Sequence, residues 1–191
     1  MKITKGNPGY IQKRKRMVII KTILQFGIVI ALLLLGIMET KSRMNLLTLV
    51  AVLGCLPASK SLVEVIMIFP HRTIAVDTAN EIKEKTLYLT VAYDLVLTSE
   101  KHIMPIDCVV ISDNTICGYT SNEKTDIIFA AKHIKQILYA NQFTNVSVKI
   151  FDSFTAFITR VEGMNNIAAV EKNDTKKKEE SIRQVILNIS L

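Results

Sequence analysis

Two apolar runs near the N-terminus constrain the fold of this chain more than any other feature. Residues 22–38, TILQFGIVIALLLLGIM, carry no charge, and a second apolar run covers residues 44–69. Only ETKSR separates them. Because a helix of about 20 apolar residues crosses a bilayer, we predict an antiparallel transmembrane hairpin over residues 22–69. A cleaved signal peptide is the alternative for the first run. The second run close behind it, and the lack of a clear small-residue cleavage site, disfavour that alternative.

The net charge of +7 is unevenly distributed along the chain. Residues 1–75 hold 11 Lys or Arg against 2 Asp or Glu, whereas residues 76–191 hold 13 against 15. Basic residues stay on the cytoplasmic side of a membrane, so the basic segment 1–21 predicts a cytoplasmic N-terminus. Two crossings return the chain to the cytoplasm. We therefore predict a multi-pass protein of the cell membrane with a cytosolic domain over 74–191. The mildly acidic domain has no bulk attraction for phosphate backbones, so nucleic acid is not an expected partner.

Two charged residues interrupt the second apolar run. Lys60 and Glu64 lie four residues apart, so on a helix they share one face and can form an ion pair. Charges inside a membrane suggest function, and here they would suit a buried contact in an oligomer. The structural alternative is that Pro57 ends or kinks the spanning part. Residues 59–69 would then form an interfacial helix, with Lys60 reaching the headgroups.

The C-terminal part of the sequence changes its hydrophobic period several times. Alternating stretches rich in β-branched residues predict strands, and a period of three to four predicts helices. We therefore predict an α/β (α+β) domain of order α-β-β-β-α-β-β-α. The expected helices cover 77–85, 126–140 and the chain from 165 onward, and the expected strands cover 87–98, 103–112, 115–120, 146–151 and 156–162. Asp77 or Thr78 is the expected cap of the first helix, and 176–180 (KKKEE) a solvated helix face or link.

The stretch PIDCVVI in the second predicted strand places one acid, Asp107, near the strand start. This order and motif resemble the restriction-endonuclease-like fold, and within it the nuclease-related domain family. In that family the Asp is followed across a hairpin by Glu-x-Lys, and the two acids hold a divalent metal. The family's spacing puts the Glu position near Thr120 and the Lys position near Asn122. The resemblance thus implies a fold with only half of the family's catalytic motif.

Hairpin geometry leads to the same position independently. If Asp113-Asn114 is a two-residue turn, Ser112 faces Thr115, and the residue numbers of every facing pair add up to 227. Asp107 then faces Thr120. One carboxylate and a hydroxyl make a poor Mg²⁺ site. By the same pairing Cys108 faces Tyr119 and Cys117 faces Val110, so the two thiols are not positioned for a disulfide.

No other catalytic pattern is evident in the sequence. His71, His102 and His133 stand in different predicted elements without metal-ligand spacing, and no phosphate-binding glycine loop occurs. We therefore predict no cofactor and no metal, and treat Asp107 as a weak catalytic candidate.

The whole chain, above all LLTLVAVLGCLPASKSLVEVIMIFP, also resembles an uncharacterised family of small bacterial membrane proteins with two N-terminal transmembrane helices. The resemblance implies a topology and no activity. The expected function is a membrane-anchored binding or self-assembly module whose partners are the lipid bilayer and a second copy or a membrane-proximal protein. One alternative is a degenerate metal-dependent nuclease. The other is a transporter accessory or oligomeric membrane component that uses Lys60 and Glu64.

Overall fold

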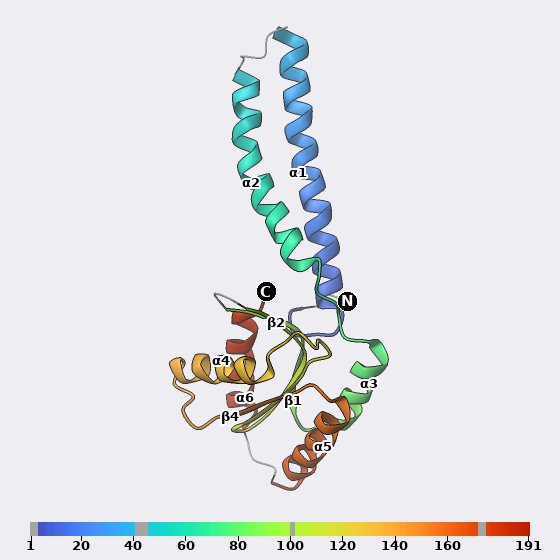
Figure 1. Cartoon of the computed structure of the whole chain (residues 1–191), viewed down its shortest axis with the longest axis vertical. Coiled ribbons are helices and arrows are strands. Elements are labelled where there is room, and N and C mark those ends of the chain that lie inside the picture. Colours follow the sequence, from blue (N-terminus) through green and yellow to red (C-terminus); the bar gives the residue numbers. More distant parts are fainter. Residues whose placement is uncertain (1–3, 41–45, 100–101, 172–174) are drawn as a thin grey trace. The chain divides into compact units, whose positions relative to one another are not determined.

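The chain divides into two units, each described on its own. The computed structural model describes residues 4–40, 46–99, 102–171 and 175–191. One unit, Ile11–His71, contains two apolar helices, and the other, Met1–Tyr10 with Arg72–Leu191, contains a sheet and helices (Figure 1). The fold is therefore α+β with two N-terminal apolar helices, as predicted.

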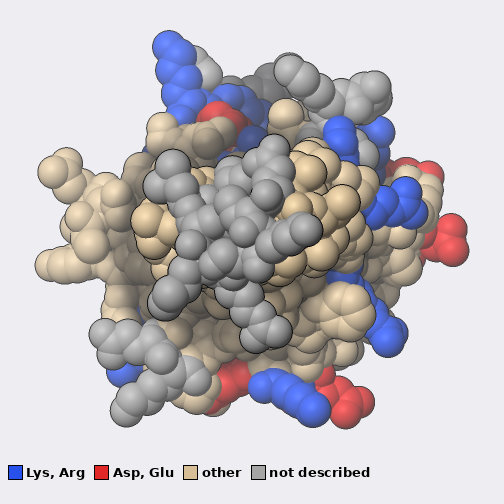
Figure 2. All heavy atoms as spheres, turned by 90° about the horizontal axis from the view of Figure 1, so that it is seen from above, with Lys and Arg blue, Asp and Glu red and all other residues tan. Residues whose placement is uncertain are grey.

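The two apolar helices are longer than the uncharged stretches that predict them. Helix α1 covers Tyr10–Thr40 and helix α2 covers Leu46–Ile68. Both are long and apolar enough to cross a membrane, judged by length and composition. Figure 2 shows basic and acidic side chains interspersed on the described surface. Helix α2 continues through Pro57, so residues on both sides of this proline belong to one helix.

Small side chains line the face of α2 that is buried in this unit. Ala51, Ala58 and Ser61 are almost fully buried, and the backbone at Gly54 lies close to Val29 of α1. Small residues let two helix backbones approach closely, which is how helices pack where the hydrophobic effect is absent. The sequence of α2 is therefore suited to pairing with α1.

The domain is built on a four-stranded mixed sheet of order β1-β2-β3-β4. The strands are β1 (Thr90–Thr98), β2 (Ile103–Ser112), β3 (Thr115–Tyr119) and β4 (Ser147–Phe151). The first three are antiparallel, and β4 runs parallel to β3. A parallel pair needs a crossover connection, and α4 (Ile127–Ala140) provides it.

Helices cover both faces of the sheet (Figure 1). On one face α4 and α6 (Lys176–Ile189) enclose a core that includes Leu97, Ile106, Ile134 and Ile186. On the other, α3 (Val76–Lys85) and α5 (Phe154–Glu171) enclose a second core, with Ile82, Val110, Phe157 and Val161. At ~25 cal/mol per Å² of buried apolar surface, these two cores are the main stabilising contribution to the domain.

One predicted strand is wrong. Residues 156–162 lie within helix α5, where Phe157, Val161 and Met164 are the buried positions. Their spacing of four and three is helical, although Phe, Ile, Thr and Val in this stretch are typical strand formers. The helix from 165 onward is therefore two helices, the end of α5 and α6.

Two local details also differ from the prediction. Helix α3 begins at Val76 after Ala75, with no side-chain cap, so neither Asp77 nor Thr78 caps it. The segment 176–180 is the first turn of α6, and its Glu179 is buried, so this turn is not simply a solvated face. Helix α4 does have a side-chain cap, since the Asp126 carboxylate accepts hydrogen bonds from the N–H groups of Ile128 and Phe129.

Candidate functional site

The carboxylate of Asp107 organises the loop after β3. Its Oδ2 accepts a hydrogen bond from the backbone N–H of Ser121 at 2.6 Å. The neighbouring Thr120 is buried, and its hydroxyl donates to the carbonyl of Pro105 at 2.8 Å. The predicted register is confirmed, since Cys108 pairs with Tyr119 and Ser112 with Thr115. Both side chains expected at the nuclease-like position are thus engaged with the backbone.

A second acid, Asp94 on β1, stands opposite Asp107. Tyr93 pairs with Cys108 and Leu95 with Ile106, which leaves Asp94 across from Asp107. The described residues contain no group of three or more His, Cys, Asp or Glu side chains that could hold a metal ion.

Asp94 was not singled out from the sequence. It is buried and adopts a left-handed backbone with φ of 56°. Its Oδ1 accepts from the N–H of Ile74 at 3.0 Å, and its Oδ2 accepts from the hydroxyl of Thr73. That hydroxyl in turn accepts from the N–H of Gly9 at 3.1 Å. Asp94 therefore fastens two segments, 4–9 and 72–75, to strand β1.

Glu179 plays a similar part at the other end of the sheet. Its carboxylate accepts from the hydroxyl of Thr90 at 2.6 Å, and from the N–H of Asp113 and the hydroxyl of Thr175, each at 3.0 Å. Burial raises the pKa of Glu179, but these hydrogen bonds and the nearby Lys176 outweigh it and lower the pKa below its ordinary value. Glu179 thus joins α6 to β1 and to the β2–β3 turn.

The pair between Lys60 and Glu64 stays a prediction, and in the structure Glu64 lies beside a base of α1. Glu64 Oε1 lies 3.0 Å from Nη2 of Arg14, which belongs to the basic start of α1. Lys15 of the same stretch lies over the ring of Phe69, 4.6 Å from its centroid. The basic start of α1 and the last turns of α2 therefore form a polar section of the hairpin.

The remaining predicted candidates lie apart from these acids. Cys108 and Cys117 are free and buried, and burial raises the pKa of both thiols, so neither is an activated nucleophile. His102 and His133, which the sequence separates by thirty residues, contact the same ring: the centroid of Phe129 lies 4.8 Å from His102 and 6.2 Å from His133. Aromatic packing is the structural role of both.

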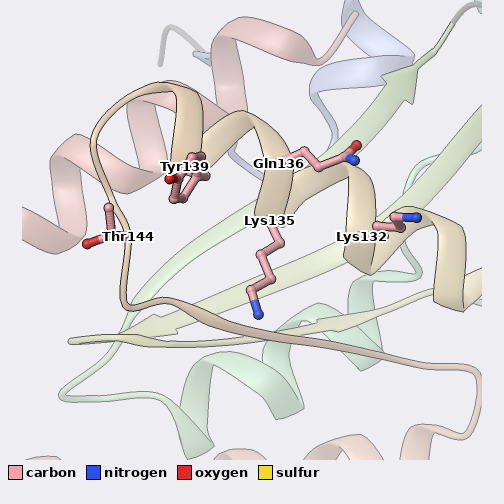
Figure 3. Close-up of a pocket in the computed structure, with 5 residues that line it drawn as sticks. All are labelled: Lys132, Lys135, Gln136, Tyr139 and Thr144. Atoms are coloured by element: carbon pink, nitrogen blue, oxygen red, sulfur yellow. The ribbon is translucent and has the colours of Figure 1, made fainter.

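A hollowed, basic surface lies over α4 and its connection to β4. A cavity of about 270 Å³ is lined there by Lys132, Lys135, Gln136, Tyr139 and Thr144 (Figure 3). All five are exposed, with the first four on α4 and Thr144 on the loop that leads into β4. Because β4 is the last strand of the sheet, this cavity lies beside a sheet edge. We call these five residues, together with strand β4, the α4–β4 surface.

The charge of this region is opposite in sign to that of the rest of the domain. Residues 127–161 contain Lys132, Lys135, Lys149 and Arg160 but only one acid, Asp152. The domain as a whole has more acids than bases, so the positive charge is concentrated here. The excess of basic residues over 127–161 is visible in the sequence. Only the sheet order shows that the strand within it, β4, lies at an edge of the sheet.

Comparisons with protein-family models, curated proteins and solved structures found no match to this chain.

Proposed function

We propose that the protein is a membrane-anchored binding module in which the α4–β4 surface of the domain binds a protein partner. The observation that carries the proposal is the coincidence, on one surface, of a cavity, a cluster of lysines and a sheet edge. Pockets with a few polar groups are the usual places of ligand contact. The two apolar helices would hold this surface near a bilayer.

The use of the acids favours binding over catalysis. Asp94, Asp107 and Glu179 each accept hydrogen bonds from backbone N–H groups of neighbouring segments. A carboxylate that is engaged in this way holds the fold together, and a general base or metal ligand needs free lone pairs directed at a substrate. These contacts support a structural role for the acids in the domain.

The orientation follows from charge. The basic residues before α1, and those in its first turns, place the N-terminus on the cytoplasmic side. Two crossings place the domain on the same side. We therefore propose a cytoplasmic domain at the cell membrane.

A degenerate nuclease is the second candidate. The resemblance to restriction-endonuclease-like proteins rests on the predicted order α-β-β-β-α-β-β-α and on Asp107 in the second strand, and the elements from α3 to β4 follow the first part of that order. Under this hypothesis the full-length protein cleaves nucleic acid with Mg²⁺ or Mn²⁺, and Asp107→Ala abolishes cleavage. Equal product from the native protein and the variant would exclude it.

Site-specific photocrosslinking in native membranes tests the binding proposal. A photoreactive amino acid replaces Tyr139 in the full-length protein, and a matched version carries it at Asn80, exposed on α3. We expect a discrete adduct from position 139, strongly reduced by Lys135→Glu, and none from position 80. An adduct pattern that is the same from both positions, or unchanged by Lys135→Glu, would refute the proposal. An adduct with a second copy of this chain would assign the surface to self-assembly.

A further inference from the structure

We propose that the free edge of β4 binds an extended, acidic segment of a partner protein as a fifth strand of the sheet. The inference rests on the proposed function and names the class of partner. Strand addition at a sheet edge is a common mode of peptide recognition, in which backbone hydrogen bonds supply affinity and side chains supply specificity.

The backbone of β4 has groups available for such a partner. The N–H of Ser147 donates to Asn114, and the carbonyl of Phe151 accepts from Thr120, so both residues face β3. By strand alternation the peptide groups of Val148 and Ile150 face outward. In the part of the chain that the structure describes, these outward groups have no hydrogen-bond partner. An added strand would supply one.

The opposite edge of the sheet shows what a covered edge looks like in this domain. On β1 the N–H of Tyr93 donates to the carbonyl of Gly6 at 2.9 Å, and the carbonyl of Val91 accepts from Nε of Arg183 at 3.0 Å. The carbonyl of Val96 accepts from the N–H of Leu191 at 2.9 Å. Both ends of the chain thus cover β1. Proteins usually protect exposed edges, because these invite pairing with other chains. No described segment pairs with the outer edge of β4, so this edge is a candidate for intended pairing.

Charge selects an acidic partner. Lys149 is exposed in the middle of β4, and Lys132 and Lys135 are exposed on α4, the helix that precedes this strand. Arg160 is exposed on α5, on the other side of the sheet, and acts electrostatically together with Lys149 on Cys117 of β3. Cross-strand pairs of opposite charge stabilise a sheet, and like charges directly opposite destabilise it. A partner strand with Glu or Asp opposite Lys149 fits this edge.

Two other occupants of this edge, a second copy of β4 and nucleic acid, fit less well. If β4 paired antiparallel with itself in a second copy, with strand centres aligned, Lys149 would face Lys149. Nucleic acid would use the lysines but not the outward peptide groups of Val148 and Ile150, and the domain has an excess of acids. A protein segment satisfies both the charges and the backbone.

The test uses the full-length protein in nanodiscs and a fluorescent nine-residue peptide of alternating Glu and Val. Matched probes carry Lys in place of Glu, or N-methyl groups on alternate backbone nitrogens along one edge. We also include a single-stranded nine-nucleotide oligomer. We expect the Glu peptide to bind at least about tenfold tighter than each of the three other probes: the Lys peptide, the N-methylated peptide and the oligomer. Its binding should shift the amide resonances of Val148 and Ile150.

Variants test the position of the peptide. Lys149→Glu should weaken binding about tenfold or more, and Lys149→Gln should weaken it less. Lys177→Glu on α6 is the matched charge change at a distant exposed site and should have only a small effect. Val148→Pro, which removes an outward N–H, should weaken binding as N-methylation of the peptide does.

Equal binding of the plain and N-methylated peptides, or tighter binding of the oligomer, would overturn the inference. If strand addition were excluded in this way but the photocrosslinked adduct from position 139 were still found, the proposed binding function would remain and only the strand-addition mode would be rejected.

Discussion

Three carboxylates of the domain, Asp94, Asp107 and Glu179, share one task at the residue scale. Each accepts a hydrogen bond from the backbone N–H of a segment outside the strand ladders: Ile74, Ser121 and Asp113 respectively. A buried N–H without a partner costs ~1–3 kcal/mol. The sequence places these acids where loops and linkers need an acceptor.

Asp94→Ala should destabilise the domain by about 2–3 kcal/mol, because it removes a charged acceptor from Ile74 and Thr73. Asp94→Asn should cost less, since Asn can accept a hydrogen bond and tolerates a positive φ. Hydrogen exchange of the core amides of Val109 and Val110 in the full-length protein measures the free energy of opening. Equal losses in the two variants would contradict the account.

Asp107→Ala should expose the amide of Ser121 to exchange and cost ~1–2 kcal/mol, with a smaller loss for Asp107→Asn. Hydrogen exchange at Ser121 checks this directly. If the exchange rate of Ser121 were unchanged in Asp107→Ala, the 2.6 Å contact would not be significant in solution.

The sequence predicts Asp107 better than Asp94 for a physical reason. A two-residue turn fixes the β2–β3 register, so the partner positions of Asp107 follow by counting. Asp94 depends on a left-handed backbone in the middle of a strand and on contacts with Thr73 and Ile74, about twenty positions away. Neither feature has a local sequence signal.

At the scale of elements, α6 is held to the sheet by the buried Glu179 as well as by its apolar face. On that face Ile182 and Ile186 are buried, and Val185 and Ile189 are partly buried. Glu179 adds contacts to β1 and to the β2–β3 turn. The docking of α6 should therefore depend on pH.

The folded pKa of Glu179 lies below its unfolded value, so its contribution is fully present above the unfolded value of about 4.5. The contribution is lost as the pH falls through the lower, folded pKa. We expect the protection factors of the α6 amides, taken relative to their intrinsic exchange rates at each pH, to fall below pH 4.5 in the native protein. In Glu179→Gln, the pH-dependent part of this fall should be smaller, and α6 should be less protected at pH 7. Identical pH profiles for the two proteins would contradict this role.

Helix α5 shows where element prediction from the sequence fails. Phe, Ile, Thr and Val favour strands between residues 156 and 162, but burial of Phe157, Val161 and Met164 against the sheet decides for a helix. Tertiary packing thus overrides local propensity. The α4–β4 surface was missed for the same reason, since an edge strand is defined by sheet order and not by its own residues.

At the scale of the whole molecule, different sequence patterns predict the two units. The apolar helices follow directly from hydropathy and length, and the domain core follows from alternation and helical period. Residues 4–9 precede α1 in sequence, yet Gly6 and Gly9 bond to β1 and to Thr73. Only the structure shows that the domain includes the N-terminal end of the chain.

The proposed topology predicts which cysteines an impermeant maleimide reaches. The natural cysteines are first replaced by Ser or Ala. Gln184→Cys, exposed on α6, should react only after cells are permeabilised, whereas Ser42→Cys between the apolar helices should react in intact cells. The opposite pattern would invert the topology, and labelling of both in intact cells would exclude a cytoplasmic domain.

The central claim is that the acids maintain the domain and that the α4–β4 surface binds. Affinity capture of the full-length protein from mildly crosslinked membranes tests it most directly, with native protein, Asp107→Asn and the double variant Lys135→Glu/Lys149→Glu side by side. The account predicts a stoichiometric protein partner that Asp107→Asn retains and the double variant loses. Loss of the partner in Asp107→Asn, with retention in the double variant, would contradict it and move the functional site to the loop after β3.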